Sequence, residues 1–179
     1  PLPPDCRHLL ILSGSMGCGP IPPLVRLIAG GMSEECRVSV VCGSNQRLYR
    51  AMEQEYAGDP RVQILGYRKD APLLMDSADL YMTKPGGIST TAAASKRLPM
   101  VLVNAVAGCE TYTMRYFIHL GAAATPDTPE ELAGLALALL THPAELGRIS
   151  DAERPPAHAP APPLILAHHP ARSPALPRL

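Results

Sequence analysis

Short apolar segments alternate with longer amphipathic segments over most of the chain, from Arg7 to about Ile149. The apolar segments are rich in valine, leucine and isoleucine and are bounded by glycine, proline and asparagine, a pattern that predicts β-strands. The longer segments repeat apolar residues with the spacing of an α-helix. The predicted strands are His8–Leu12, Arg37–Cys42, Val62–Leu65, Leu80–Thr83, Met100–Val103 and Ala122–Ala124. The predicted helices are Ile21–Gly30, Gln46–Tyr56, Ala71–Ser77, Ser89–Lys96, Glu110–His119 and Glu130–Leu140, the last with Thr128 and Glu131 as its capping box.

This alternation predicts an α/β domain with a Rossmann-like parallel sheet and flanking helices. The strands carry few polar residues, as expected of a sheet that is buried on both faces. We expect the domain to occupy residues 7–149, after a linker at residues 1–6. Residues 150–179 are rich in proline and alanine, and this composition predicts a disordered tail.

Composition excludes several classes of function. Sixteen basic residues balance sixteen acidic ones, which argues against a nucleic-acid binder. No apolar run is long enough to cross a bilayer, and the first residues do not resemble a signal peptide. The five cysteines are irregularly spaced, so we expect neither a disulfide framework nor a zinc site. Cys36 and Cys42 are expected to be buried thiols, while Cys18 and Cys109 lie at predicted helix starts, where a thiolate is stabilised.

Three loops follow predicted strands and therefore meet at the carboxyl edge of the sheet, where ligands bind in such folds: Ser13–Gly19, Lys84–Thr90 and Ala107–Glu110. The first is rich in glycine and opens a helix, an arrangement that favours an anion. Ser15 adds a hydroxyl to it. The loop matches neither a dinucleotide-binding fingerprint nor a P-loop, and it is equally consistent with a tight turn between strand and helix.

The second loop strengthens the prediction of an anion site. Gly86 and Gly87 precede the hydroxyl residues Ser89 and Thr90 at another helix start, and the alternative interpretation is a capped helix with Ser89 or Thr90 as its cap. Two such helix starts at one edge suit a diphosphate better than a single phosphate. Lys84 is either a charge partner or a solvated side chain.

Other candidates at this edge are weaker. Glu110 can accept hydrogen bonds from sugar hydroxyls, or it is an acid favoured by the helix dipole. The backbone at Gly66 and Tyr67 can pair with a base, whereas Asn45 is a weaker candidate that also fits a helix cap. The sequence offers no Ser/His/Asp set, no convincing general base and no cluster of metal ligands.

The order of these motifs resembles glycosyltransferase family 28, especially the diacylglycerol β-glucosyltransferases and the monogalactosyldiacylglycerol synthases. The resemblance covers roughly Leu9 to Leu140. It rests on the runs Leu12–Gly17, Gly66–Tyr67, Asp79–Thr91, Leu98–Met100 and Ala107–Glu110.

The resemblance implies the C-terminal, donor-binding half of a GT-B fold. It places Gly14, Ser15, Met16 and Gly17 near the donor diphosphate, Gly66 and Tyr67 near uracil, Gly86, Gly87, Ile88, Ser89 and Thr90 at the phosphates, and Glu110 at the sugar. The implied donor is UDP-glucose or UDP-galactose, and the implied acceptor is diacylglycerol. The implied reaction inverts the anomeric centre, without a metal or another cofactor. The implied location is cytoplasmic and peripheral on the membrane, with the acceptor site and catalytic base in an N-terminal half.

The chain departs from the family pattern at three points. Ala92 stands where the family usually has a glutamate that holds the ribose, and Thr111 and Thr113 replace a usual glutamate and asparagine. By the same resemblance we expect this chain to lack the N-terminal half. We therefore expect weak donor binding and little or no transfer by this chain alone, and two alternatives remain open: a degenerate, non-catalytic nucleotide-sugar binding module, and a UDP-sugar epimerase-like enzyme.

Overall fold

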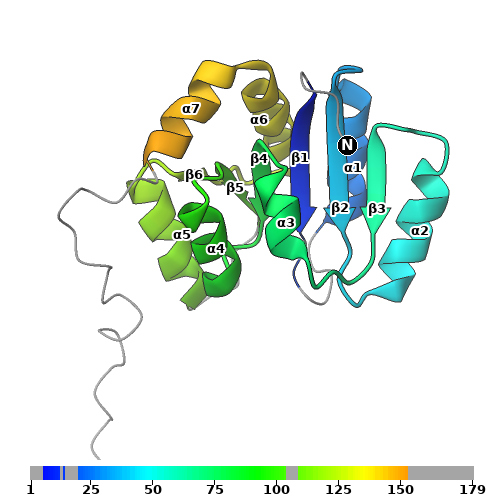
Figure 1. The fold of residues 1–179 in the computed structure, drawn as a ribbon, viewed down its shortest axis with the longest axis horizontal. Coiled ribbons are helices and arrows are strands. Elements are labelled where there is room, and N and C mark those ends of the chain that lie inside the picture. Colours follow the sequence, from blue (N-terminus) through cyan, green and yellow to red (C-terminus); the bar gives the residue numbers. More distant parts are fainter. Residues whose placement is uncertain (1–5, 13, 15–19, 104–108, 153–179) are drawn as a thin grey trace, which may run out of the picture.

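Six parallel strands form one sheet in the order β3-β2-β1-β4-β5-β6 (Figure 1). The computed structural model describes residues 6–12, 14, 20–103 and 109–152. The strands are β1 Arg7–Leu12, β2 Cys36–Val41, β3 Val62–Leu65, β4 Leu80–Thr83, β5 Met100–Leu102 and β6 Ala123–Ala124. The helices are α1 Ile21–Gly31, α2 Gln46–Tyr56, α3 Ala71–Asp76, α4 Gly87–Ser95, α5 Cys109–His119, α6 Pro129–Thr141 and α7 Pro143–Ala152. The predicted Rossmann-like α/β sheet is confirmed.

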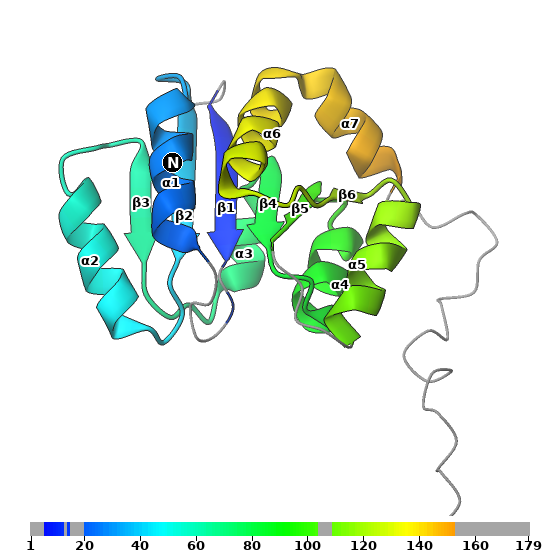
Figure 2. The ribbon, with the colours of Figure 1, turned by 180° about the vertical axis from the view of Figure 1, so that it is seen from behind.

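The two faces of the sheet pack against different helices, because successive side chains of a strand point to opposite faces. Leu9 and Ile11 of β1 belong to a core cluster with α1 and α6, whereas Leu10 belongs to a second cluster with α3, α4 and α5. Figure 2 shows α1 and α6 covering the first face. The buried, apolar strands therefore explain the three-layer arrangement.

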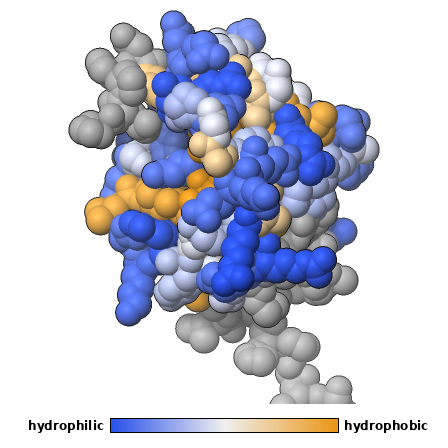
Figure 3. Space-filling view, turned by 90° about the vertical axis from the view of Figure 1, so that its right-hand side faces the viewer, coloured by the Kyte–Doolittle hydropathy of each residue, from blue (hydrophilic) through white to orange (hydrophobic). Residues whose placement is uncertain are grey.

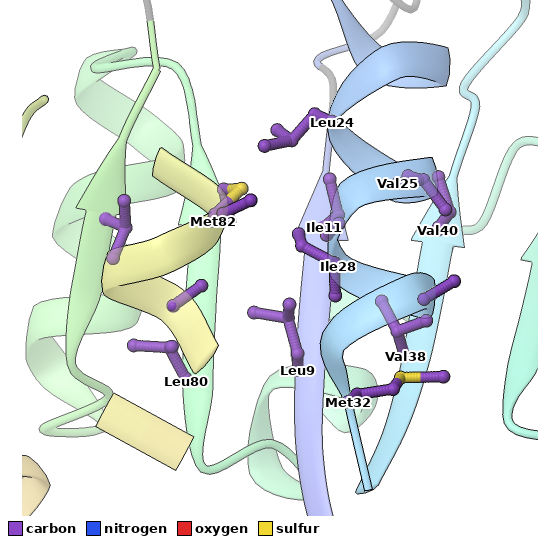
Figure 4. Packing of buried hydrophobic residues seen from close by; sticks show 14 of the residues in the cluster. Leu9, Ile11, Leu24, Val25, Ile28, Met32, Val38, Val40, Leu80 and Met82 are labelled. Carbon is purple, nitrogen blue, oxygen red and sulfur yellow. The ribbon is translucent and has the colours of Figure 1, made fainter. Parts of the chain in front are cut away.

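The packing of α1 on the sheet illustrates how the first core cluster is built. Val25 and Ile28 of α1 lie beside Val40 and Ile11 of the neighbouring strands, and Leu24 of α1 belongs to the same cluster (Figure 4). Each of these five side chains is at most 1% exposed. Burial of this extent contributes about 1.5–3 kcal/mol for each large aliphatic side chain. The strands whose carboxyl ends carry the loops are therefore held in place by a closely packed core.

Most predicted elements occur within one or two residues of their expected bounds. Thr128 and Glu131 form the predicted capping box of α6. The start of α4 was predicted two residues too late, because the helix begins at Gly87 and its N-cap is Gly86 rather than Ser89 or Thr90. No helix was predicted for α7, which has one buried residue, Leu146, packed in the first core cluster.

The side of the molecule on which α2 lies is mainly hydrophilic and is crossed by a band of apolar residues (Figure 3). Among the residues of α2, Met52 is the buried one. The outer face of this helix therefore meets solvent, and α2 serves mainly to cover the β3 side of the sheet.

Candidate functional site

Strands β1 and β4 are neighbours at the centre of the sheet, although they are far apart in the sequence. The hydroxyl of Thr83, at the end of β4, donates a hydrogen bond of 3.0 Å to the carbonyl oxygen of Leu12, at the end of β1. From here the chain runs outward in both directions, from β1 to β2 and from β4 to β5. In open α/β sheets ligands bind at this reversal of strand order, outside the carboxyl ends of the strands.

Gly14 brings the loop after β1 into contact with the loop after β4. A Cβ atom at Gly14 would lie 3.1 Å from Cε of Lys84, and the φ angle of Gly14 is +77°. Both features favour glycine, since other residues rarely adopt a positive φ. Ser15, Met16 and Gly17, the other candidates in this loop, lie outside the described residues.

Lys84 also reaches the third predicted loop. Its Nζ lies 2.8 Å from Oε1 of Glu110, in the first turn of α5. The Glu110 side chain is 14% exposed and that of Lys84 is 37% exposed. The structure thus brings together three segments that the sequence predicted at this edge: Gly14 from the first, Lys84 from the second and Glu110 from the third.

The start of α4 lies between these residues in the sequence and begins at the same edge. Gly86 is the N-cap, and glycine has no side chain with which to accept a hydrogen bond from the first turn. The first backbone N–H groups of a helix have no partner within the helix, and together with the helix dipole they favour an anion. The predicted anion-binding character of this helix start is therefore consistent with the geometry.

The hydroxyl groups of Ser89 and Thr90 are engaged inside the protein. Ser89 Oγ lies 2.5 Å from the hydroxyl of Tyr81 and 3.3 Å from that of Thr83. Thr90 is fully buried and donates to the carbonyl oxygen of Gly86 at 3.0 Å. The backbone N–H of Thr90 also donates to the carbonyl oxygen of Gly86, at 3.0 Å, so any contact of these two residues with a ligand would come from the backbone N–H of Ser89.

Two large exposed side chains lie in segments at this edge of the sheet. Tyr67 follows β3 and is 62% exposed, and Ile88 in the first turn of α4 is 92% exposed. Gly66 precedes Tyr67 and is partly buried. Because β2 separates β3 from β1, the Gly66–Tyr67 segment lies two strands away from Gly14.

Several weaker candidates have structural roles. Asn45 is the N-cap of α2, and its side chain accepts a hydrogen bond from the N–H of Leu48. Cys36 and Cys42 are buried as predicted, and burial raises the pKa of the Cys42 thiol to about 11. Cys18 lies outside the described residues. Among the residues that the structure describes, no group of three or more His, Cys, Asp or Glu side chains could hold a metal ion.

The Lys84–Glu110 ion pair and the Tyr81–Ser89 contact are the site features that the sequence did not predict. Lys84 directly follows a strand and precedes a helix start that favours an anion. This position indicated that the lysine could take part in an ion pair at the site. Tyr81 lies in β4, eight positions before Ser89, and its position gave only a weak indication of the contact between the two hydroxyl groups.

The sequence is similar to a processive diacylglycerol beta-glucosyltransferase from Staphylococcus aureus (strain Newman). The two are 31% identical over 140 residues, which make up 77% of this chain and 35% of the relative. The chain therefore spans about a third of the length of this curated relative. No protein-family model matches the sequence.

Similar folds occur in solved glycosyltransferase structures. WaaG, a glycosyltransferase involved in lipopolysaccharide biosynthesis, has a TM-score of 0.68 and 19% identity, over 86% of this chain and 43% of WaaG. MurG from Acinetobacter baumannii has a TM-score of 0.67 and 22% identity, over 85% and 46% of the two chains.

Two further solved structures have similar folds. HepE from Anabaena, solved in complex with UDP and glucose, has a TM-score of 0.66 and 17% identity, over 83% of this chain and 42% of HepE. A UDP-N-acetylglucosamine 2-epimerase has a TM-score of 0.62 and 18% identity, over 83% and 38% of the two chains. At these identities the likeness shows a shared fold.

Proposed function

Because this chain is homologous to the diacylglycerol β-glucosyltransferases and has the fold of one half of a GT-B glycosyltransferase, we propose that it binds the UDP-sugar donor of such an enzyme. The donor is UDP-glucose or UDP-galactose, and the hexose passes to diacylglycerol with inversion. The observation that carries the proposal is the meeting of Gly14, Lys84 and Glu110 at the reversal of strand order, next to the start of α4.

The site chemistry suits a diphosphate attached to a sugar. A helix start whose N-cap is a glycine and the ammonium group of Lys84 favour the phosphates, and the carboxylate of Glu110 can accept hydrogen bonds from sugar hydroxyls. The exposed ring of Tyr67 offers a surface for the base. The proposed donor-binding residues are Gly14, Ser15, Met16, Gly17, Gly66, Tyr67, Gly86, Gly87, Ile88, Ser89, Thr90 and Glu110.

In the complete enzyme, which we assign to glycosyltransferase family 28, a second half supplies the acceptor site and the catalytic base. Helix starts and Lys84 offset the charge of the leaving diphosphate, so the reaction uses no metal or other cofactor. This chain alone would then bind the donor and show little or no transfer.

Among the residues that the structure describes, no helix is long and apolar enough to span a bilayer. We propose a cytoplasmic enzyme that meets its lipid acceptor at the membrane surface through the other half.

Two other functions have a specific observation in their favour. Ala92 on α4 offers no carboxylate for the ribose hydroxyls, which favours a non-catalytic nucleotide-sugar binding module. The likeness to an epimerase fold favours a UDP-sugar epimerase. Donor binding without transfer by a longer protein that includes the second half would support the module, and isomerisation of UDP-N-acetylglucosamine would support the epimerase.

Calorimetric titration of UDP and UDP-glucose into the protein tests donor binding. Gly86→Asp places a carboxylate at the anion site, and a Cβ atom at Gly86 meets nothing within 4 Å. Asp is also a favourable N-cap, so the fold should be retained. The proposal expects saturable UDP binding that Gly86→Asp abolishes and that the neutral cap Gly86→Asn largely keeps.

Gly134→Asp is the matched control, because Gly134 is an exposed residue of α6 and an added Cβ atom there meets nothing within 4 Å. It should leave UDP binding unchanged. Absence of any binding by the wild-type protein at millimolar UDP would refute the proposal.

A further inference from the structure

Helix α5 has one side packed against the sheet and the opposite side in solvent. Phe117 is buried in the second core cluster. On the other side of the helix, Tyr112 and Tyr116 are 68% and 38% exposed. Arg115 and His119 are exposed on that same side, because residues three and four positions apart share one face of a helix. Tyr112, Arg115, Tyr116 and His119 therefore form one row, which we call the α5 stripe.

The surface around the α5 stripe carries no exposed carboxylate on either of two neighbouring helices. Helices α4 and α5 lie side by side and pack on the same face of the sheet (Figure 1 and Figure 2). The acidic residue of α5, Glu110, has a side chain that is only 14% exposed and is paired with Lys84. The exposed residues of α4 are all uncharged: Gly87, Ile88, Thr91 and Ser95.

Arg115 is thus the one lysine, arginine or acid among the exposed residues that the structure describes on α4 and α5. None of the salt bridges within the described part of the chain involves it. Basic and acidic residues balance over the whole sequence, so this surface is locally positive on a chain without net charge.

Helix α2 shows that other surfaces of the molecule are different. Among its exposed residues, charges of both signs alternate: Arg47, Arg50, Glu53 and Glu55. Interspersed charges of this kind are typical of a surface that meets only water. Exposed apolar groups without such charges mark an interaction site instead.

We propose that the α5 stripe and the adjoining surface of α4 bind a lipid surface with anionic headgroups. Tyrosine settles at the boundary between headgroups and acyl chains, because its ring is apolar and its hydroxyl stays hydrated. Arg115 attracts the headgroups, and no exposed carboxylate on these helices offsets this attraction. Ile88, which is 92% exposed, adds an apolar side chain at the start of α4.

The chemistry of the surface favours a lipid over a protein as its occupant. A partner protein would need a groove to receive a convex helix face and an acidic side chain opposite Arg115. A lipid surface supplies anionic groups and a deformable apolar layer together.

This inference goes beyond the proposed donor binding and does not depend on it. Helices α4 and α5 both begin at the carboxyl edge of the sheet, where Gly14, Lys84 and Glu110 meet. Contact along α5 would therefore hold this edge close to the bilayer, in addition to any contact made by the other half of the complete enzyme.

Co-sedimentation of the protein with vesicles tests the inference, with equal parts of phosphatidylcholine and phosphatidylglycerol as the lipid. Tyr112→Ser combined with Tyr116→Ser should weaken binding by about 10-fold or more, because two rings are lost from the contact. Arg115→Gln should weaken it by about 5-fold, the scale for one basic residue at an anionic surface. The effect of Arg115→Gln should vanish at high salt and on vesicles of phosphatidylcholine alone.

Fluorescence locates the contact independently of affinity. The chain contains no tryptophan, so a single introduced tryptophan reports only on its own surroundings. The emission of Tyr112→Trp should shift to shorter wavelength when vesicles are added. That of Leu27→Trp should not shift, because Leu27 is an exposed residue of α1, which covers the other face of the sheet.

Leu27→Ser on α1 and Arg47→Gln on α2 are matched controls and should leave vesicle binding unchanged. Thermal melts show whether each variant is folded. A wild-type protein that does not bind the anionic vesicles, or stripe variants that bind as well as the controls do, would overturn the inference. Self-association that the two tyrosine substitutions abolish, without vesicle binding, would overturn it in favour of a contact between copies of the chain. UDP binding is measured separately by calorimetry, so these outcomes leave the proposed function untouched.

Discussion

Lys84 and Glu110 form an ion pair of 2.8 Å that ties the end of β4 to the first turn of α5. The pair closes one side of the site at the centre of the sheet, beside Gly14. It links two segments that are 26 positions apart in the sequence. The same contact therefore contributes to stability and to the proposed recognition of the donor.

The stability contribution of this pair can be measured with a double-mutant cycle. Lys84→Met leaves the largely buried carboxylate of Glu110 without this partner, so we expect a loss of about 1–3 kcal/mol in the free energy of unfolding. Adding Glu110→Gln should recover part of the loss. Urea denaturation of the four proteins gives the coupling energy, and a coupling energy near zero would show that the contact is unimportant for folding.

Replacing Gly14 should disturb both the fold and the site. Gly14→Ala forces a side chain into a φ of +77° and brings its Cβ atom to 3.1 Å from Cε of Lys84. We expect a loss of about 1–2 kcal/mol in stability from the backbone alone, together with weaker UDP binding. Denaturation and calorimetry check the two effects.

The control for Gly14 is Gly30→Ala, in the last turns of α1, where an added Cβ atom meets nothing within 4 Å. Alanine in a helix is favoured over glycine by about 0.5–1 kcal/mol, so this variant should be more stable than the wild type. Equal losses in the two variants would contradict a specific role for the conformation of Gly14.

Arg97 is a site where a substitution should raise stability. It follows α4 with a φ of 53°, and Leu98 N–H donates to the carbonyl oxygen of Ala93 in the manner of a Schellman motif. Glycine is the preferred residue at this position, so Arg97→Gly should stabilise the protein by about 1 kcal/mol. A lowered melting temperature would show that the arginine side chain contributes more than the backbone strain costs.

His8 should make stability depend on pH. Its side chain is 3% exposed, Nδ1 donates to the carbonyl oxygen of Ser77 at 2.9 Å, and Nε2 lies 2.9 Å from Ser39 Oγ. Burial lowers the pKa of His8 below 6.5, an effect that the hydrogen bond to Ser77 and the charge of Asp79 partly oppose.

Because the unfolded chain then binds a proton before the folded chain does, stability is highest above pH 6.5 and falls as the pH drops below this value. Melting curves between pH 5 and pH 8 measure the trend, and His8→Gln should flatten it. Asp59 and Asp70 do not interfere, because hydrogen bonds from Arg61 and Arg68 keep their pKa values below 3.8. An unchanged slope in His8→Gln would exclude His8 as the cause.

The sequence was a good guide where local signals decide the structure. The apolar strand Val62–Leu65 has its predicted bounds, and so does the helix Gln46–Tyr56, which Asn45 caps. The capping box of α6 could also be predicted from the sequence, because it depends on two residues that are only three positions apart.

Features that depend on long-range packing were not predicted. The Lys84–Glu110 pair requires that β4 and β5 be neighbours, and a pattern of apolar residues does not give side-chain contacts. The helix α7 was missed because Leu146 is the one buried residue among those of its positions whose burial the structure describes. Ser89 was predicted as a possible helix cap, yet the cap is Gly86 and the hydroxyl of Tyr81, from the preceding strand, contacts the hydroxyl of Ser89.

The most direct test of the account is a titration of the isotope-labelled protein with UDP, followed by backbone amide NMR. We expect the largest shift changes at Gly14, at Lys84, at Gly86 to Ser89, and at Glu110, with further changes at Tyr67. These residues belong to separate segments at one edge of the sheet. The account would be contradicted if UDP caused no changes at millimolar concentration, or if the changes clustered around the cavity of about 310 Å³ that Arg97 and Gly147 help to line at the opposite edge.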